Sequence, residues 1–137
     1  MYKIGFTGTQ KGMKGYQPFL IRLFFKKYAS EISEVHHGDC IGADKDFHDI
    51  AKEFLLKVVL HPPKNPSKRA FCKAEVELPK EEYLDRNHKI VDNCDMLIAT
   101  PKGEEELRSG TWATIRYAKK IKKQVLIIYP DGNFEII

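Results

Sequence analysis

Two short segments made almost wholly of apolar residues constrain the fold of this chain more than any other feature of its sequence. They are residues 96–99 (MLIA) and residues 125–129 (VLIIY). A strand exposed on one face alternates polar and apolar residues, and neither segment does so. Near-continuous apolar strands are instead typical of a parallel sheet that is covered by helices on both faces. The two segments therefore predict an α/β protein.

The rest of the chain alternates short apolar strands with stretches of helical spacing. Additional strands are expected at residues 3–7, 34–37 and 57–61, with a short antiparallel edge strand at 134–137. Helices are expected after Pro18, after a cap at Asp44, over residues 81–92, and from about Thr111. Residues 62–79 contain four prolines and are expected to be mostly loop. We predict that residues 1–137 form a single-domain, Rossmann-like open sheet of about five mainly parallel strands with helices on both faces.

Apolar residues recur at helical spacing in several of the expected helices. After Pro18 they are Phe19, Leu20, Leu23, Phe24 and Tyr28. Leu84, His88 and Val91 are spaced along residues 81–92, and Ile115, Ala118 and Ile121 are expected to face inward in the helix from about Thr111.

The composition excludes several classes of protein. With 42% hydrophobic and 31% charged residues, the chain is neither disordered nor a collagen-like fibre. The three cysteines lack a CxxC spacing, which indicates reduced intracellular thiols. No apolar run has the length of a membrane span and the first residues do not resemble a signal peptide, so no membrane contact and a cytoplasmic location are expected.

The net charge of +4 is too mild to indicate nucleic acid by itself. The basic run at residues 119–123 is open to two interpretations. It contacts nucleic acid, or it is a solvated helix end whose cations favour the helix dipole. We favour the second interpretation.

Each expected strand ends in residues that are unsuited to a core. These ends are Thr7-Gly8-Thr9, Gly38-Asp39, His61, Thr100, and Tyr129 with Asp131. The carboxyl ends of parallel strands lie along one edge of the sheet, and ligands bind in the crevice beside them. The sequence therefore predicts a binding site at this edge.

Two of the loops at this edge have features of phosphate sites. Gly8 and Thr9 follow the first strand, and Ser109-Gly110-Thr111 precedes a helix whose free N–H groups favour an anion. Arg108 is placed to add a charge-assisted contact. Ser109 is equally explained as a helix cap, and Trp112 either stacks on a base or packs the helix against the sheet.

Residues 36–48 contain several possible metal ligands, namely His36, His37, Asp39, Cys40, Asp44 and His48. Neighbouring side chains of a strand point to opposite faces, so His36 and His37 cannot reach one ion. We expect no metal and no cofactor, and interpret Asp39 and Asp44 as caps or as acceptors for ribose hydroxyls.

Four motifs in order along nearly the whole chain resemble the SLOG superfamily. They are Gly5-Phe6-Thr7-Gly8-Thr9, the HGDCIGAD stretch of residues 37–44, Arg86-Asn87 ahead of residues 95–99, and Ser109-Gly110-Thr111-Trp112. This superfamily of Rossmann-like proteins includes the Lonely Guy phosphoribohydrolases and the Smf/DprA recombination mediators. The resemblance is to a small, single-domain branch, and it implies that the chain binds a nucleotide or a nucleotide derivative.

The resemblance also implies roles for particular residues. Gly110 and Thr111 match the glycine and threonine of the Lonely Guy PGGxGTxxE motif, and Arg86 matches an arginine of those enzymes. The motif glutamate, however, falls on Thr114 here, which cannot stabilise an oxocarbenium ion or activate water. Candidate replacements are Asp39, Glu104, Glu105 and Glu106.

The sequence therefore favours a protein that senses, carries or sequesters a nucleotide-like small molecule over an enzyme, and leaves open whether it has enzymatic activity. A nucleoside 5′-monophosphate phosphoribohydrolase is the alternative, with Arg86, Asp39 and Glu105 as its candidate catalytic residues. Binding of single-stranded DNA is the second alternative, and nucleic acid is the less favoured partner. Base rates for folds of this kind predict a homo-oligomer, and we expect a dimer.

Overall fold

A computed structural model describes all residues from 1 to 137 and contains one sheet of seven strands. The strands are β1 (Tyr2–Gly8), β2 (Ile32–His37), β3 (Val58–Leu60), β4 (Val76–Glu77), β5 (Met96–Thr100), β6 (Gln124–Ile128) and β7 (Phe134–Ile136). The α-helices are α1 (Gln17–Tyr28), α2 (Ala43–Glu53), α3 (Tyr83–Asp92) and α4 (Gly110–Lys120). Short 3-10 turns lie at Ala29–Glu31 and Pro66–Lys68.

The order of the strands in space is β4-β3-β2-β1-β5-β6-β7, and only β7 runs antiparallel to its neighbour. The chain builds outward from β1 in one direction and then returns to β1 to build in the other. The strand order thus reverses at β1, which pairs with β2 on one side and β5 on the other. In open α/β sheets the ligand crevice lies at such a switch point, outside the carboxyl ends of the strands.

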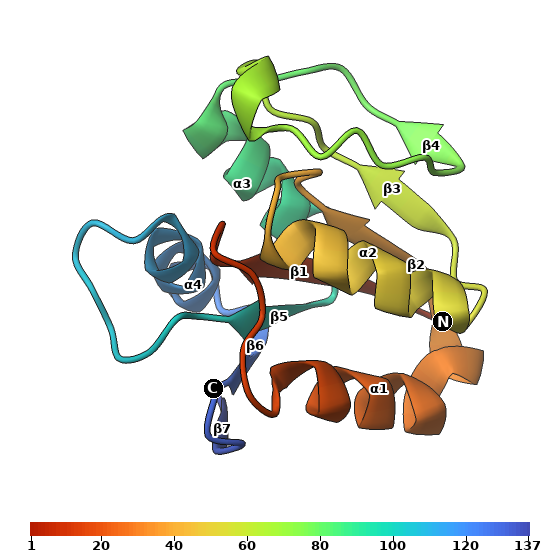
Figure 1. The fold of residues 1–137 in the computed structure, drawn as a ribbon, viewed down its shortest axis with the longest axis vertical. Helices are drawn as coiled ribbons and strands as arrows, with labels where there is room; N and C mark the ends of the chain where they lie inside the picture. The colour runs from red at the N-terminus through yellow and green to blue at the C-terminus, as the bar shows by residue number, and fades with distance from the viewer.

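The helices cover both faces of the sheet. Helices α1 and α2 pack against each other on one face, as seen in front of the strands in Figure 1, and α3 and α4 pack against each other on the opposite face. Phe25 of α1 and Phe47 of α2 belong to the larger core cluster, where Phe47 stacks on Phe6 of β1 at 4.2 Å. Val91 of α3 and Ile115 of α4 belong to the second cluster. The predicted Rossmann-like class is therefore confirmed.

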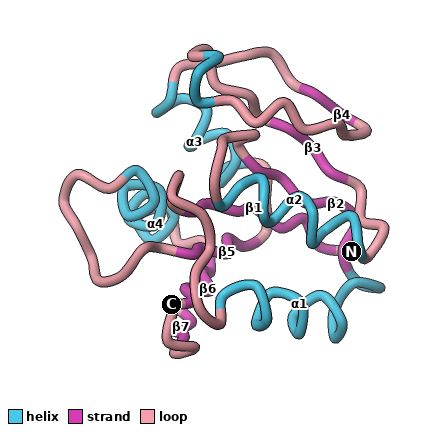
Figure 2. Tube along the Cα trace, in the orientation of Figure 1, coloured by secondary structure: helices cyan, strands magenta, loops and turns pink.

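The strand count differs slightly from the expected one. The edge strand β7 was predicted, whereas the two-residue β4 was not, because it lies in the proline-rich segment that is otherwise mostly loop (Figure 2). No helix of the structure has the length and apolar character that crossing a membrane requires.

The buried sides of two helices include polar residues. The fully buried side of α1 is Gln17, Ile21 and Phe25, whereas Phe19 and Leu23 are exposed. The amide of Gln17 donates to the carbonyl oxygens of Pro101 and Ile128, both at 2.8 Å, and this fixes the rotation of the helix.

In α3 the buried side is Arg86, Asn87, Ile90 and Val91, and Leu84 is exposed. Of the residues spaced along this helix, Val91 is on the buried side, which begins with two polar residues whose hydrogen bonds are described below. In α4, Ile115 and Ala118 face inward as expected, whereas Ile121, just past the end of the helix, is 37% exposed.

Candidate functional site

A cavity of about 450 Å³ lies at the switch point, beside the carboxyl ends of β1 and β5. Two loops enclose most of it, the one that follows β1 and the one that joins β5 to α4. The residues that line it are Gly8, Thr9, Gln10, Lys11, Ile41, Tyr83, Lys102, Gly103, Glu106, Ser109, Gly110, Thr111 and Trp112. We call this space the outer cavity.

The amino end of α4 opens onto the outer cavity. Ser109 caps the helix, and its hydroxyl accepts the N–H of Trp112 at 3.2 Å. The N–H groups of Gly110 and Thr111 lie in the first turn of α4, where no carbonyl oxygen of the helix is placed to accept them. Lys11 and Lys102 line the same space. The helix dipole and the two ammonium groups together favour an anion here.

A small inner pocket continues from the outer cavity and shares Gly8, Gln10 and Tyr83 with it. Its other lining residues are Phe6, Thr7, Gly38, Cys40, Asp44, Arg86, Asn87 and Ile90. The hydroxyl of Tyr83 lies close to Gly110, the first residue of α4: a Cβ built on Gly110 would be only 1.8 Å from it. Tyr83 therefore lies between the helix end and the inner pocket.

Arg86 is the main charge of the inner pocket and is only 3% exposed. Its Nη1 donates to the carbonyl oxygen of Gly38 at 2.6 Å and to that of His61 at 3.3 Å. Its Nε donates to Asn87 at 2.8 Å, and its guanidinium lies 5.0 Å from the centre of the Tyr83 ring. All of these partners are uncharged. The guanidinium thus has no carboxylate within ion-pair distance, although the Asp44 carboxyl is near enough for the Arg86 charge to lower its pKa.

Asp44 supplies the carboxylate of the inner pocket. Its Oδ2 accepts the N–H of Cys40 at 3.2 Å, in the turn that precedes α2. Burial raises the pKa of the Asp44 carboxyl from 3.8 to about 6, although the nearby Arg86 charge lowers it. The predicted cap at Asp44 was wrong, because the N-cap of α2 is Gly42 and Asp44 lies in the first turn.

One polar atom at the switch point has no partner in the protein. The hydroxyl of Thr100, at the end of β5, is fully buried and forms no hydrogen bond. It lies directly behind Gly8, where an added Cβ would approach it to 2.5 Å. A Cβ at position 8 would also lie 2.5 Å from the Cβ of Ala43 in α2, so glycine is needed where β1 passes between α2 and β5.

Two of the residues expected to bind the ligand lie apart from both spaces. The carboxylate of Asp39 is fully buried and accepts the Nε of Arg69 at 2.7 Å and the N–H of Cys72 at 2.9 Å. It thereby ties the loop after β2 to the segment at 69–72. Arg108 is exposed and lines neither space.

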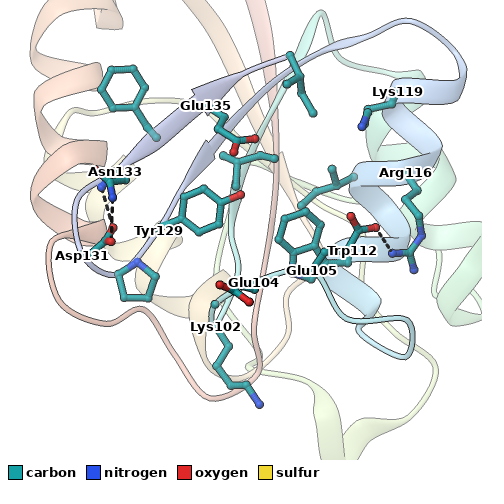
Figure 3. Close-up of a pocket in the computed structure, with 16 residues that line it drawn as sticks. Lys102, Glu104, Glu105, Trp112, Arg116, Lys119, Tyr129, Asp131, Asn133 and Glu135 are labelled. Atoms are coloured by element: carbon teal, nitrogen blue, oxygen red, sulfur yellow. Dashed lines mark hydrogen bonds and ion pairs between the residues drawn. The ribbon is translucent and has the colours of Figure 1, made fainter.

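Of the glutamates considered as catalytic replacements, Glu106 lines the outer cavity, whereas Glu104 and Glu105 line a second cleft. This cleft has a volume of about 750 Å³, shares Lys102, Gly103 and Trp112 with the outer cavity, and is also lined by Tyr129 and Glu135 (Figure 3). Glu105 is paired with Arg116 at 2.8 Å. Burial and the Glu135 charge raise the pKa of the Tyr129 hydroxyl. Thr114, at the position of the motif glutamate, bonds to the carbonyl of Gly110.

The histidines divide between the two faces of the sheet, as strand alternation predicted. His36 contacts His61 at 2.8 Å, whereas His37 contacts His48 at 3.0 Å. The ligand atoms of His37, His48 and Cys72 lie within 4.8 Å of one another. However, Nδ1 of His37 accepts the N–H of Asp39, so its proton is on Nε2 and faces His48. This arrangement is a hydrogen-bonded chain that leaves His37 no free lone pair for an ion.

The strand order defines a Rossmann-like α/β protein with a crevice at the switch point. The DNA processing protein A from Helicobacter pylori, described for its single-stranded DNA binding mode, has this fold with a TM-score of 0.65 and 17% identity, over 92% of this chain and 64% of that chain. The X-ray structure of TM1055, a structural genomics target, has a TM-score of 0.66 and 17% identity, over 91% of this chain and 72% of that chain. No protein-family model and no curated protein matches the chain.

This likeness shows the fold and confirms the fold that the SLOG resemblance implied. The chain spans less than two thirds of the matched DNA processing protein, at 64% of its length.

Ten of the twelve residues expected to bind the ligand line the outer cavity or the inner pocket, the exceptions being Asp39 and Arg108. Sequence reasoning missed Lys11, Tyr83, Asn87 and Lys102. Of these four, only Asn87 could have been found from the sequence, because it follows Arg86 in one of the motifs that resemble the SLOG superfamily. Trp112 is 6% exposed and packs in the second core cluster, with part of its surface on the cavity.

Proposed function

We propose that this protein binds a nucleotide or a nucleotide-derived small molecule in the crevice at the switch point. The phosphate binds at the amino end of α4, between Lys11 and Lys102. The remainder of the ligand extends toward Tyr83 and Arg86. The proposed role is to sense, carry or sequester this ligand, and the cytoplasmic location remains a prediction from the sequence.

The observation that carries the proposal is the buried, unpaired charge of Arg86 beside a helix end that favours anions. Arg86 forms hydrogen bonds to carbonyl oxygens, to an amide and to a thiol, and none to a carboxylate. A buried charge is costly unless it is compensated, so an anionic ligand would improve the energetics of this site. The neutral hydroxyl of Thr100 behind Gly8 is a further unused polar group at the same edge.

Calorimetry tests the proposal with nucleoside 5′-monophosphates, ADP-ribose derivatives and cyclic nucleotides. We expect at least one compound to bind, and Lys11→Ala with Lys102→Ala to raise its dissociation constant about tenfold or more. Lys26→Ala is the matched control, because Lys26 is exposed near the distant end of α1. No binding of any compound at millimolar concentration would refute the proposal.

The second candidate is hydrolysis of the N-glycosidic bond of a bound nucleotide. The position of Asp44 favours it, since Asp44 is a carboxyl in the same pocket as Arg86, with its pKa raised to about 6. A carboxyl with a pKa near neutrality is suited to transfer a proton. Release of free base from a nucleotide, abolished by Asp44→Asn but not by Glu105→Gln, would support this activity. Nucleotides that stay intact after long incubation would exclude it for the panel used.

Single-stranded DNA is the third candidate, because the matched DNA processing protein is described for binding it. The basic run at residues 119–123 begins at the carboxyl end of α4, whereas the crevice lies at its amino end. One strand would have to contact both ends of the helix. Gel shifts at low and moderate salt test this, because affinity for DNA falls steeply with salt.

A further inference from the structure

Strand β7 is one edge of the sheet, and its outer side has no partner strand. In its ladder with β6, the N–H of Ile137 donates to the carbonyl oxygen of Val125 at 2.9 Å, and the N–H of Val125 donates back to Ile137 at 2.8 Å. Successive residues of an antiparallel strand direct their N–H and C=O groups to opposite sides. The main-chain groups of Phe134 and Ile136 therefore point away from β6 and are free to pair with a further strand.

The residues of β7 do not block such pairing. Natural edge strands are commonly protected by lysine, proline or a β-bulge. The segment 134–137 (FEII) has neither lysine nor proline, and it pairs with β6 without a register shift. Phe134 is 59% exposed and Ile136 61%, and both lie on the sheet face that carries α1. Apolar side chains of an added strand would cover them on that face.

The opposite face of β7 borders the cleft of Figure 3. Glu135 and Ile137 line this cleft, together with Tyr129 after β6 and Trp112 of α4. The rings of Trp112 and Tyr129 lie 6.5 Å apart, with 34° between their planes. The faces of aromatic rings attract the ammonium and guanidinium groups of basic side chains.

The unpaired charge in the cleft is mainly negative. The carboxylates of Glu104, Asp131 and Glu135 form no ion pair in the structure. Lys119 is the one cation of the cleft without an ion-pair partner. Burial raises the pKa of the Tyr129 hydroxyl, and the nearby glutamate charges raise it further. The cleft therefore attracts a cationic group and repels the phosphates of a nucleic acid.

We propose that β7 binds an extended segment of a partner protein as an additional strand, and that basic and apolar residues alternate in this segment. Its main chain pairs with Phe134 and Ile136, and its apolar side chains lie beside them. Its basic side chains lie beside Glu135 and extend into the cleft toward Tyr129 and Trp112. A second copy of β7 is a poor occupant, because antiparallel pairing about a two-fold axis brings the two Glu135 carboxylates together.

The proposed docking edge and the nucleotide site are separate. No residue of β7 lines the outer cavity or the inner pocket. The proposal therefore does not depend on the proposed function. Variants in β7 are expected to leave nucleotide binding unchanged.

Fluorescence anisotropy of the whole chain with a labelled peptide, in which valine and lysine alternate, tests the proposal. We expect binding that saturates below millimolar concentration. Ile136→Pro should raise the dissociation constant about tenfold or more, because proline removes an N–H that points away from β6 and leaves the bonds of Ile137 in place. Ile136→Val is the matched control, since it keeps that N–H and an apolar side chain. Circular dichroism of each variant checks that it is folded.

A charge reversal tests the role of the cleft. Glu135→Lys is expected to weaken binding of the basic peptide and to allow binding of a peptide in which valine and glutamate alternate. Glu82→Lys is the matched control, because Glu82 is exposed just before α3, and it should change neither affinity.

Three results would overturn the proposal. The first is no binding of the basic peptide at millimolar concentration, and the second is equal affinity of the unaltered chain for the basic and acidic peptides. The third is an affinity for the basic peptide that Ile136→Pro leaves unchanged. A dimer in analytical ultracentrifugation that Ile136→Pro dissociates would also overturn it, by assigning the edge to a second copy of the chain.

Discussion

Arg86 and Asp44 approach Gly38 from two sides without forming an ion pair. A Cβ built on Gly38 would lie 2.3 Å from Nη1 of Arg86 and 2.9 Å from Oδ2 of Asp44. The two groups are brought together from α3 and from the first turn of α2, at the end of β2. Glycine at position 38 is thus the reason that a buried cation and a buried carboxyl can share one pocket.

Gly38→Ala is expected to destabilise the fold by about 1–3 kcal/mol, because the added methyl group displaces Arg86 and overpacks the pocket. Urea denaturation measures the free energy of unfolding. Gly103→Ala is the control, since a Cβ at Gly103 has no heavy atom within 4 Å, and its effect should stay within about 0.5 kcal/mol. Equal effects of the two substitutions would show that the contact with Arg86 does not constrain position 38.

Asp44 should make the binding of an anionic ligand depend on pH. Its pKa is raised to about 6, so the carboxylate is charged above that pH and repels an anion held by Arg86. Affinity for a cyclic nucleotide, whose phosphodiester does not titrate in this range, should therefore rise as the pH falls through 6. Calorimetry at several pH values measures this trend. In Asp44→Asn the trend should be lost, and an unchanged trend would assign it to another group.

The buried histidines predict a loss of stability in acid. Burial lowers the pKa of His37 well below 6.5 and that of His61 to about 3. The unfolded chain therefore takes up protons before the folded one, and the free energy of unfolding falls as the pH drops below 6.5. Each such histidine contributes a slope of up to about 1.4 kcal/mol per pH unit.

Asp44 acts in the opposite direction. Because its folded pKa of about 6 exceeds the ordinary 3.8, the folded state binds that proton first, and this favours folding between those two pH values. Urea denaturation between pH 7 and about 5 measures the net slope. The slope corresponds to the number of protons that the chain takes up on unfolding, and His61→Gln should reduce that number by about one. An unchanged slope would contradict the role of His61.

Ser109 is expected to serve both the helix and the ligand, and two substitutions separate these roles. Ser109→Ala removes the cap on Trp112 and should cost about 1 kcal/mol of stability. Ser109→Asp retains a capping oxygen, so stability is kept, but its negative charge opposes a phosphate at the same helix end. Thermal unfolding and calorimetry measure the two effects. Full affinity in Ser109→Asp would place the phosphate elsewhere.

Much of the fold could be predicted because its signals are local. The apolar runs at residues 96–99 and 125–129 contribute most of β5 and β6, whose residues are largely buried because helices cover both faces of the parallel sheet. The polar strand ends at Thr7, Gly8 and Gly38 lie at one edge because parallel strands share a direction. These inferences required only the spacing and type of neighbouring residues.

The orientation of α1 illustrates what local signals cannot decide. Apolar residues occur nearly all round this helix, so periodicity does not select a buried side. The hydrogen bonds of Gln17 to Pro101 and Ile128, more than 80 and 110 residues away, select it. A contact at that separation has no signature in the sequence around Gln17.

The chain's sequence by itself determined the α/β class, the parallel sheet and the edge at which a ligand can bind, since burial and strand direction follow from residue order. Only the tertiary structure decided which carboxyl faces Arg86. Asp39 and Asp44 lie five residues apart in the same motif, and the sequence does not distinguish their roles. In the structure Asp39 accepts a hydrogen bond from Arg69, whereas Asp44 lines the inner pocket. The reason is physical: a side chain's partners are set by what packs against it, and those partners come from distant parts of the chain.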